Sequence, residues 1–357
     1  LPKLLKTKMY HIKIRESEEY ITYKSERKEK SQNSGLACDQ GMSNYSKFLE
    51  YLAAKEETVP RIKGAENVLL YGVPGVGKSH EIQTKYCDDP ERMERVVFHP
   101  DYTYSDFVGQ ILPKVENDKL KYEFTAGPFT TLLAKAWNNP GKEYYLVIEE
   151  INRGNAPAIF GEIFQLLDRK TEDSHRYDPS EYGESEYPIT NSDIATAVFG
   201  DPEEKIRIPS NMWILATMNT ADQNVFTLDT AFQRRWKLHH MKNDVMSAGH
   251  SKTKIEGSEI EWGTFASVIN EMVTDYSLEM MSSEDKRLGA YFVKKNELSE
   301  EEFQEKVLKY LWDDAFKMKK DAVFDDKFKS LETVIEAYEL SEPDKLKAVL
   351  RLEVYQK

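Results

Sequence analysis

The sequence has 357 residues, of which 40% are hydrophobic and 31% are charged, and its formal net charge is −13. This composition is typical of globular protein, and no apolar run approaches the roughly 18 residues that suggest a membrane span. We therefore expect no membrane association and a chain long enough for two domains. The acidic balance disfavours a broad basic face for the phosphates of nucleic acid.

The N-terminal extension, residues 1–60, indicates little about function. Residues 10–24 alternate well enough to predict a small hairpin, and a polar linker and a helical pattern follow. The sequence starts without a methionine and without the long apolar core of a signal peptide, so we interpret it as a fragment of a longer chain. Its two cysteines, Cys38 and Cys87, are too few for a disulfide framework or a zinc site and favour a cytoplasmic location.

Residues 61–245 alternate short apolar runs with segments of helical spacing. Runs that begin near residues 67, 95, 144 and 211 are predicted as strands, which indicates an α/β domain with a mostly parallel sheet and helices on its faces. The polar stretch 171–205 is too long for an ordinary connection, and such loops are usually functional or disordered. In residues 246–357 the strands stop, and amphipathic patterns predict a helical second domain.

The stretch "GVPGVGKS" matches the phosphate-binding pattern G-x-x-x-x-G-K-[ST] between a predicted strand and a predicted helix. Its glycines permit a tight loop with inward backbone N–H groups, and the helix N-terminus favours an anion. Lys78 is expected to reach the terminal phosphates, and the Ser79 hydroxyl is expected to ligate Mg²⁺. A structural turn would leave Lys78 without a role. The predicted nucleotide-binding residues are Gly72, Val73, Pro74, Gly75, Val76, Gly77, Lys78 and Ser79.

Two carboxylates, Glu149 and Glu150, end the apolar run "YYLVIEE". Ligands collect at the carboxyl ends of parallel strands, and a carboxylate there steadies the metal of P-loop enzymes. Glu149 is therefore expected near Mg²⁺, through coordinated water, and Glu150 is expected to polarise the attacking water as general base. Aspartate is the common residue at the first position, so the extra methylene of Glu149 requires a different spacing to the metal. A solvent-exposed strand end explains the acids equally well when this stretch is taken alone.

Polar and basic residues follow the next apolar run, "WILATMN". Asn219 could hold the attacking water or the γ-phosphate from a strand between the P-loop strand and the acid strand, and a simple turn is the alternative. A short helical segment after it ends in Arg234 and Arg235. The alternative for this pair is an exposed basic helix end, which the helix dipole favours.

The order P-loop, acid strand, polar strand, paired arginines and helical segment resembles that of the AAA+ ATPases. Four segments resemble the McrB family more narrowly, within the dynein-related AAA group: "FHPDYTYSDFVGQILP", "YEFTAGPFTTLLAKA", "EEINRGNAPAIFGEIFQLLDR" and "ATMNTADQ". The close resemblance covers roughly residues 66 to 240, and "RLGAYFV" at 287 matches more loosely. It implies an AAA+ P-loop fold with a five-stranded sheet and a C-terminal helical lid domain.

The resemblance also implies an activity and partners. McrB-family proteins are GTP-hydrolysing motor subunits of methylation-dependent restriction systems, so GTP with Mg²⁺ is expected, with ATP as the alternative. In that family the asparagine of the "MNTAD" motif is needed for hydrolysis, and it corresponds to Asn219 here. The asparagine of the "EINR" segment corresponds to Asn152. A ring is implied, expected to be a hexamer, in which Arg234 or Arg235 completes a neighbour's site, with a McrC-type nuclease as partner and DNA bound through the complex or a separate N-terminal domain.

Two other functions remain open from the sequence. One is an ATP-dependent protein-remodelling machine of the MoxR or dynein-related kind, because nothing in the P-loop selects the base. The other is a nucleotide-binding scaffold with little hydrolysis, because Glu149 stands where aspartate is common.

Overall fold

The computed structural model describes residues 59–116, 118–172, 176–220, 226–280, 286–351 and 354–355. The hairpin, linker and first helix predicted before residue 59, and Cys38 with them, lie outside these ranges. None of the helices within them has both the length and the apolar character needed to cross a membrane.

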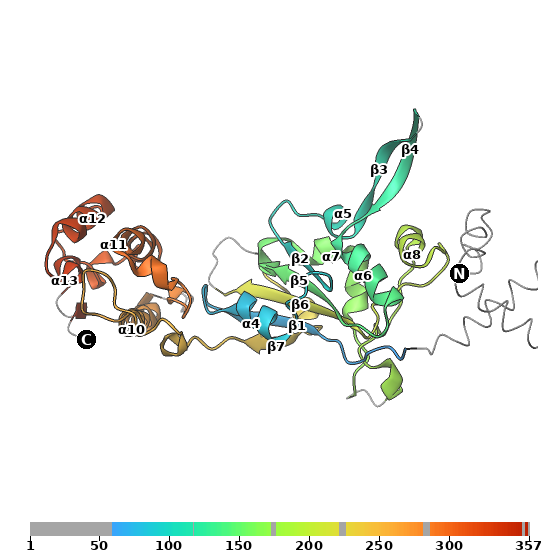
Figure 1. The fold of residues 1–357 in the computed structure, drawn as a ribbon, viewed down its shortest axis with the longest axis horizontal. Coiled ribbons are helices and arrows are strands. Elements are labelled where there is room, and N and C mark those ends of the chain that lie inside the picture. Colours follow the sequence, from blue (N-terminus) through green and yellow to red (C-terminus); the bar gives the residue numbers. More distant parts are fainter. Residues whose placement is uncertain are drawn as a thin grey trace, which may run out of the picture.

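A five-stranded parallel sheet forms the centre of the first lobe (Figure 1). Its strands lie in the order β2 (Met93–Val97), β5 (Tyr144–Glu149), β6 (Met212–Asn219), β1 (Asn67–Gly72) and β7 (Lys237–His240). The three middle strands are mostly buried, because helices cover both faces of a parallel sheet. The predicted α/β class is confirmed, and the polar strand β6 lies between the P-loop strand β1 and the acid strand β5.

Side chains along the middle strands alternate between two hydrophobic clusters. Leu69 and Leu146 belong to the larger cluster, whereas their neighbours Val68 and Val147 pack in the smaller one with Ile82. The helices of this lobe are α4 (Lys78–Lys85), α5 (Tyr104–Phe107), α6 (Pro128–Asn138), α7 (Ala156–Phe160), α8 (Ser192–Phe199) and α9 (Thr230–Gln233). Short 3₁₀ turns are η2 (Ile151–Arg153), η3 (Gly161–Leu167) and η5 (Pro179–Glu181).

Two segments differ from their predicted form. The stretch 171–205 is not one irregular loop, because α8 lies within it and buries Ile194 and Ala195 against the larger cluster. The helical pattern that starts at Pro157 is divided into α7 and η3 at Gly161, which has a φ of 49°. A regular α-helix cannot continue through a left-handed residue.

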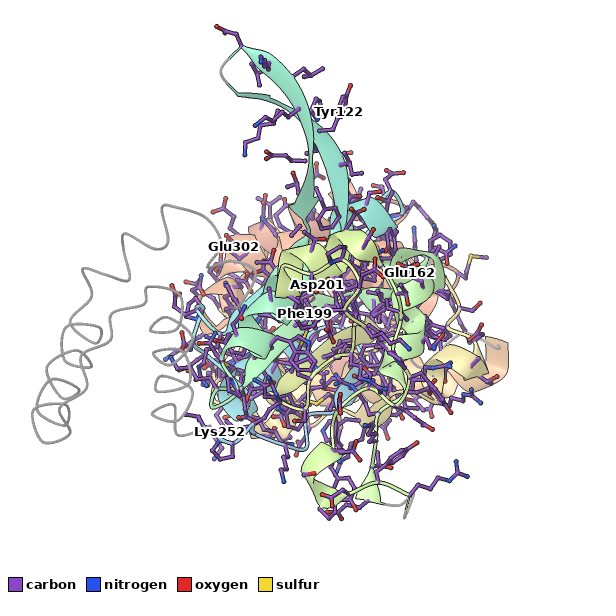
Figure 2. The ribbon with its side chains drawn as sticks, turned by 90° about the vertical axis from the view of Figure 1, so that its right-hand side faces the viewer. Tyr122, Glu162, Phe199, Asp201, Lys252 and Glu302 are labelled. Carbon is purple, nitrogen blue, oxygen red and sulfur yellow. The ribbon has the colours of Figure 1, made fainter. Side chains whose placement is uncertain are left out.

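The hairpin β3 (Gly109–Glu116) and β4 (Lys119–Ala126) projects from the body, with Tyr122 far out along it (Figures 1 and 2). The sequence pattern did not predict this element. Its strand pairing places Ile111, Pro113, Val115, Leu120, Tyr122 and Phe124 on one face. Val115 and Tyr122 remain 72% and 68% exposed, so one apolar face of the hairpin is uncovered within the described structure.

The second lobe is helical and has its own hydrophobic cluster, which includes Val245, Trp262, Phe303 and Tyr338 (Figure 1). Its α-helices are α10 (Trp262–Met280), α11 (Glu300–Phe303), α12 (Leu331–Leu340) and α13 (Lys345–Val349). Two π-helical segments, η9 (Gln304–Leu308) and η10 (Leu311–Ala315), and the 3₁₀ turns η6 (Val245–Ser247), η8 (Lys295–Leu298) and η11 (Lys320–Ala322) complete it. The predicted boundary at 245 stays a prediction, although Val245 already packs with this cluster.

Candidate nucleotide-binding site

The predicted phosphate-binding loop connects β1 to α4, as the sequence pattern requires. Gly75 and Gly77 adopt positive φ angles of 74° and 97°, which side chains rarely tolerate. Gly77 is the N-cap of α4 and supplies no side-chain acceptor to the first N–H groups of the helix. Because these groups have no partner within an α-helix, they are suited to bind an anion.

Lys78 connects this loop to the end of β6. Its ammonium donates to the carbonyl oxygens of Gly72 and Val73 at 3.0 and 3.1 Å and to Asn219 Oδ1 at 2.7 Å, and the residue is 7% exposed. The parallel register places Asn219 beside Gly72, so the neighbouring strand ends explain the contact. Lys78 is thus held at the edge of the sheet where phosphates would bind.

Glu150 is the next member of the same hydrogen-bonded chain. Asn219 Nδ2 donates to Glu150 Oε1 at 2.7 Å, and Arg153 Nε contacts the other carboxylate oxygen at 3.2 Å. Glu150 adopts a φ of 54°, a left-handed conformation that is uncommon outside glycine. Such a backbone is often found at functional sites, where the surrounding structure maintains it. Lys78, Asn219 and Glu150, which are far apart in sequence, therefore form one continuous polar cluster.

The carboxylate of Glu149 is engaged on both oxygens. Arg95 of β2 forms an ion pair with one oxygen, and the Thr217 hydroxyl donates to the other. Each oxygen thus has one donor, and the contact of Glu149 with a metal through coordinated water stays a prediction. Ser79 is exposed, and its hydroxyl has no hydrogen bond within the described ranges. The Ser79 hydroxyl is therefore free to hold Mg²⁺ with a bound nucleotide.

Asn152 is buried beside this cluster, and its amide nitrogen donates to the Asn219 carbonyl oxygen at 3.1 Å. Its own carbonyl oxygen accepts from the Phe226 N–H at 2.8 Å. Its side-chain oxygen is buried without a hydrogen-bond partner among the residues that the structure describes. Asn152 thus joins the segment after Glu150 to Asn219 at the end of β6 and to Phe226 ahead of α9.

Arg234 and Arg235 lie at the end of the sheet where β1 begins, opposite to the end that carries the P-loop. They follow α9 and precede β7, and the Asn67 side chain at the start of β1 donates to the Arg235 carbonyl oxygen at 3.0 Å. Because β1 runs from Asn67 to Gly72, its length separates the pair from the loop by roughly 17 Å. The fold does not bring these arginines to the P-loop of the same subunit.

Four contacts of the site were not indicated by the sequence pattern. Arg95 and Thr217 engage Glu149, and Arg153 engages Glu150. In the helical lobe, the Tyr291 N–H donates to the Gly75 carbonyl oxygen at 2.7 Å, so the lobe touches the P-loop directly. The glycine in "RLGAYFV" is the one local signal of this close approach.

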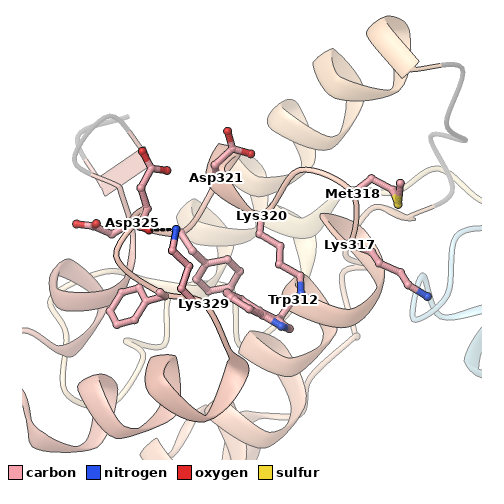
Figure 3. Close-up of a pocket in the computed structure, with 10 residues that line it drawn as sticks. Trp312, Lys317, Met318, Lys320, Asp321, Asp325 and Lys329 are labelled. Atoms are coloured by element: carbon pink, nitrogen blue, oxygen red, sulfur yellow. Dashed lines mark hydrogen bonds between the residues drawn. The ribbon is translucent and has the colours of Figure 1, made fainter.

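Cavities also lie outside the P-loop among the described residues, and two of them contain basic side chains. One, of about 1160 Å³, is lined by Lys63, Arg234 and Lys237 among others. The other, of about 330 Å³, lies in the helical lobe beside Trp312 and Lys320 (Figure 3). The Lys320 ammonium there is 4.1 Å from the centre of the Trp312 ring, so the neighbouring aromatic already engages its charge.

Comparisons with known proteins agree with this arrangement. The family model "AAA domain (dynein-related subfamily)" matches residues 67–236. The Type IV methyl-directed restriction enzyme EcoKMcrB subunit of Escherichia coli (strain K12) is 30% identical over 186 residues, 51% of this chain and 36% of that protein. The Type II restriction enzyme BsuMI component YdiS of Bacillus subtilis (strain 168) is 36% identical over 318 residues, 76% of this chain and 87% of that protein. The chain belongs to the McrB-like AAA family.

Membership of the McrB-like AAA family identifies the first lobe as a P-loop NTPase domain and accounts for its parallel sheet. The chain spans only 36% of the length of the Escherichia coli relative, so that protein has a large part without a counterpart in the alignment. A solved structure of a candidate ATPase from Cytophaga hutchinsonii aligns with 75% of this chain and 80% of that chain, at 15% identity and a TM-score of 0.30. This likeness is too low to bear on function.

Proposed function

We propose that this chain is the oligomeric motor subunit of a McrBC-like system that restricts modified DNA, and that it hydrolyses GTP to drive a partner nuclease of McrC type. The hydrogen-bonded chain Lys78–Asn219–Glu150 carries the proposal, because it joins the three side chains that a P-loop hydrolase requires. The two relatives, both described as parts of restriction enzymes, support the biological setting.

Each side chain of the cluster has a defined task in this proposal. The Lys78 ammonium binds the terminal phosphates, and the Glu150 carboxylate accepts a proton from the attacking water. Asn219 contacts both groups, so it keeps their spacing constant. Ser79 would hold Mg²⁺, with Glu149 behind its coordinated water, and this ion neutralises phosphate charge when it is bound.

The position of the paired arginines supports a ring. Phosphoryl transfer requires positive charge on the γ-phosphate beyond that of the P-loop lysine. Arg234 and Arg235 cannot supply it within their own subunit, because they lie at the opposite sheet edge. A neighbouring copy that placed its P-loop against this edge would receive the charge, and a closed ring, for which we propose six subunits, repeats the contact at every site.

Steady-state hydrolysis, measured side by side with GTP and ATP, tests the activity. The parent protein is expected to prefer GTP. Glu150→Gln should keep nucleotide binding but lose at least about 10²-fold in turnover, the usual scale for a general base. Lys78→Ala should instead lose binding. Efficient ATP hydrolysis with negligible GTP turnover would overturn the nucleotide assignment and favour the remodelling machine, and parent-rate turnover by Glu150→Gln would refute the role of this residue.

A further inference from the structure

We infer that the paired arginines divide their tasks. Arg234 is the side chain offered to the nucleotide of the neighbouring subunit, and Arg235 is a positioning residue that fixes the short helix from which Arg234 extends. The inference rests on the proposed ring, but its central observation is a difference in how the two guanidinium groups are held within one subunit.

Arg235 is committed to its own subunit. Its Nη2 donates to Asp168 Oδ2 at 2.8 Å, and its Nη1 donates to the Ala231 carbonyl oxygen at 2.8 Å. The guanidinium carbon lies 4.0 Å from the centre of the Phe164 ring, and the side chain is only 11% exposed. An arginine held by an ion pair, a hydrogen bond and an aromatic face would lose all three contacts if it reached across an interface.

The backbone around Arg235 is equally constrained. Asp229 accepts from the Phe232 N–H at 2.7 Å and caps α9 at its start. Phe232, which precedes the arginines, is fully buried. Its ring stacks on Trp236, which follows them, with ring centres 5.8 Å apart, and on Phe164, with ring centres 5.5 Å apart. The helix is therefore anchored before and after the arginines, and its orientation is set by the core.

Arg234 differs in each respect. It is exposed, and no hydrogen bond or ion pair involves its side chain in the described part of the chain. It lines the cavity of about 1160 Å³, in which Lys237 is paired with Glu66 and Arg235 with Asp168, so an incoming phosphate would meet the guanidinium of Arg234 in open space. A free guanidinium can bind phosphate without first breaking internal contacts.

Arg235 also ties this helix to the candidate site of its own subunit. Its partner Asp168 follows η3, the last of the short helices η2, α7 and η3 that succeed one another after Glu150. A shift of that run would act on α9 through Asp168 and Phe164. Arg235 is thus placed to couple one subunit's catalytic segment to the arginine that it presents to the next.

The first test is thermal unfolding without nucleotide, which no loss of hydrolysis can affect. Arg235→Ala and Asp168→Ala should each lower Tm by about 2–4 °C, the shift expected for the loss of one partly buried ion pair in a domain of this size. The double variant should unfold near Arg235→Ala, because that variant has already lost the ion pair with Asp168. Arg234→Ala is the matched control and should leave Tm unchanged.

The second test is turnover of conservative variants. Arg234→Ala should lose roughly 10³-fold, the usual contribution of an arginine supplied to a neighbouring P-loop site, and Arg234→Lys should not restore it. Arg235→Lys should keep most of the activity, because an ammonium can still pair with Asp168.

An inactive Arg235→Lys with unchanged Tm, or an Arg234→Ala variant as active as the parent, would overturn the division of tasks. Failure of the proposed function is recognised separately, because Lys78→Ala would then hydrolyse nucleotide as fast as the parent. The comparison of Tm values would still decide whether Arg235 positions the helix.

Discussion

Thr217 of β6 contacts both acids of the candidate site through one hydroxyl group. Its hydroxyl donates to Glu149 Oε2 and accepts from the Glu150 N–H at 3.2 Å. The residue is 1% exposed, so water cannot replace either contact. The Thr217 hydroxyl therefore helps to hold both the backbone of Glu150 and the carboxylate of Glu149.

Replacing the Thr217 hydroxyl with a methyl group of similar shape should destabilise the protein. Thr217→Val leaves a buried N–H and a carboxylate oxygen with one partner fewer, which is expected to lower the free energy of unfolding by about 1–3 kcal/mol. Urea denaturation measures the change, and turnover should fall because Glu150 is less well held. Thr217→Ser keeps the hydroxyl and serves as control. Equal stability of the Val variant and the parent would show that the hydroxyl is dispensable.

At the scale of elements, the P-loop and the turn at 289–292 of the helical lobe meet backbone to backbone. A Cβ atom added at Gly289 would lie 2.3 Å from both the Gly75 carbonyl carbon and the Pro74 oxygen. Tyr291 also approaches His80 at the start of α4, with ring centres 6.3 Å apart. The helical lobe thus closes over the loop through a contact that leaves no space for a side chain.

Gly289→Ala should therefore separate the two lobes locally. The clash involves backbone atoms, which cannot move aside as the end of a flexible side chain would. We expect weaker nucleotide binding, measured by titration with a fluorescent GTP analogue, and faster proteolysis of the segment around Tyr291. Gly249→Ala is a suitable control, because a Cβ atom there meets no described atom within 4 Å. Unchanged affinity in Gly289→Ala would mean that this contact does not support binding.

The projecting hairpin is an element of a different kind. An isolated two-stranded hairpin is marginally stable in water, and the apolar face around Val115 and Tyr122 gains little from burial within this chain. Its base is anchored where Gly109 approaches Phe124 and Thr125, and where the Thr130 hydroxyl donates to the Val108 carbonyl oxygen at 2.6 Å. The hairpin is consequently held at one end by the larger hydrophobic cluster.

At the scale of the whole molecule, the separation of P-loop and arginines predicts complementation between inactive subunits. Glu150→Gln lacks the general base but keeps its arginines, whereas Arg234→Ala keeps Glu150. In mixed rings, some interfaces combine an intact Glu150 with an intact Arg234 from the neighbour. Partial hydrolysis should therefore return when the two variants are mixed, and each variant incubated alone is the control. No recovery, despite co-assembly shown by mass photometry, would count against catalysis across the interface.

The sequence by itself determined the local features of this protein. The P-loop could be located because its strand, glycines, Lys78 and helix are consecutive, so short-range geometry decides their arrangement. The strands ending in Glu149 and Asn219 were predicted because buried parallel strands are apolar runs with polar ends. Their place at one sheet edge follows from parallel pairing, which the alternation of strands and helices indicates.

Only the tertiary structure decided which side chains are free and which are held. Arg234 and Arg235 are identical in type and adjacent in sequence, yet Asp168 and Phe164 engage only the second. In the sequence, Thr217 is an ordinary strand residue and Gly289 an isolated glycine. The fold places Thr217 against the two acids and Gly289 against the P-loop. These contacts join segments far apart in the chain, and burial and hydrogen bonding between such segments depend on packing, which no local pattern of residue types specifies.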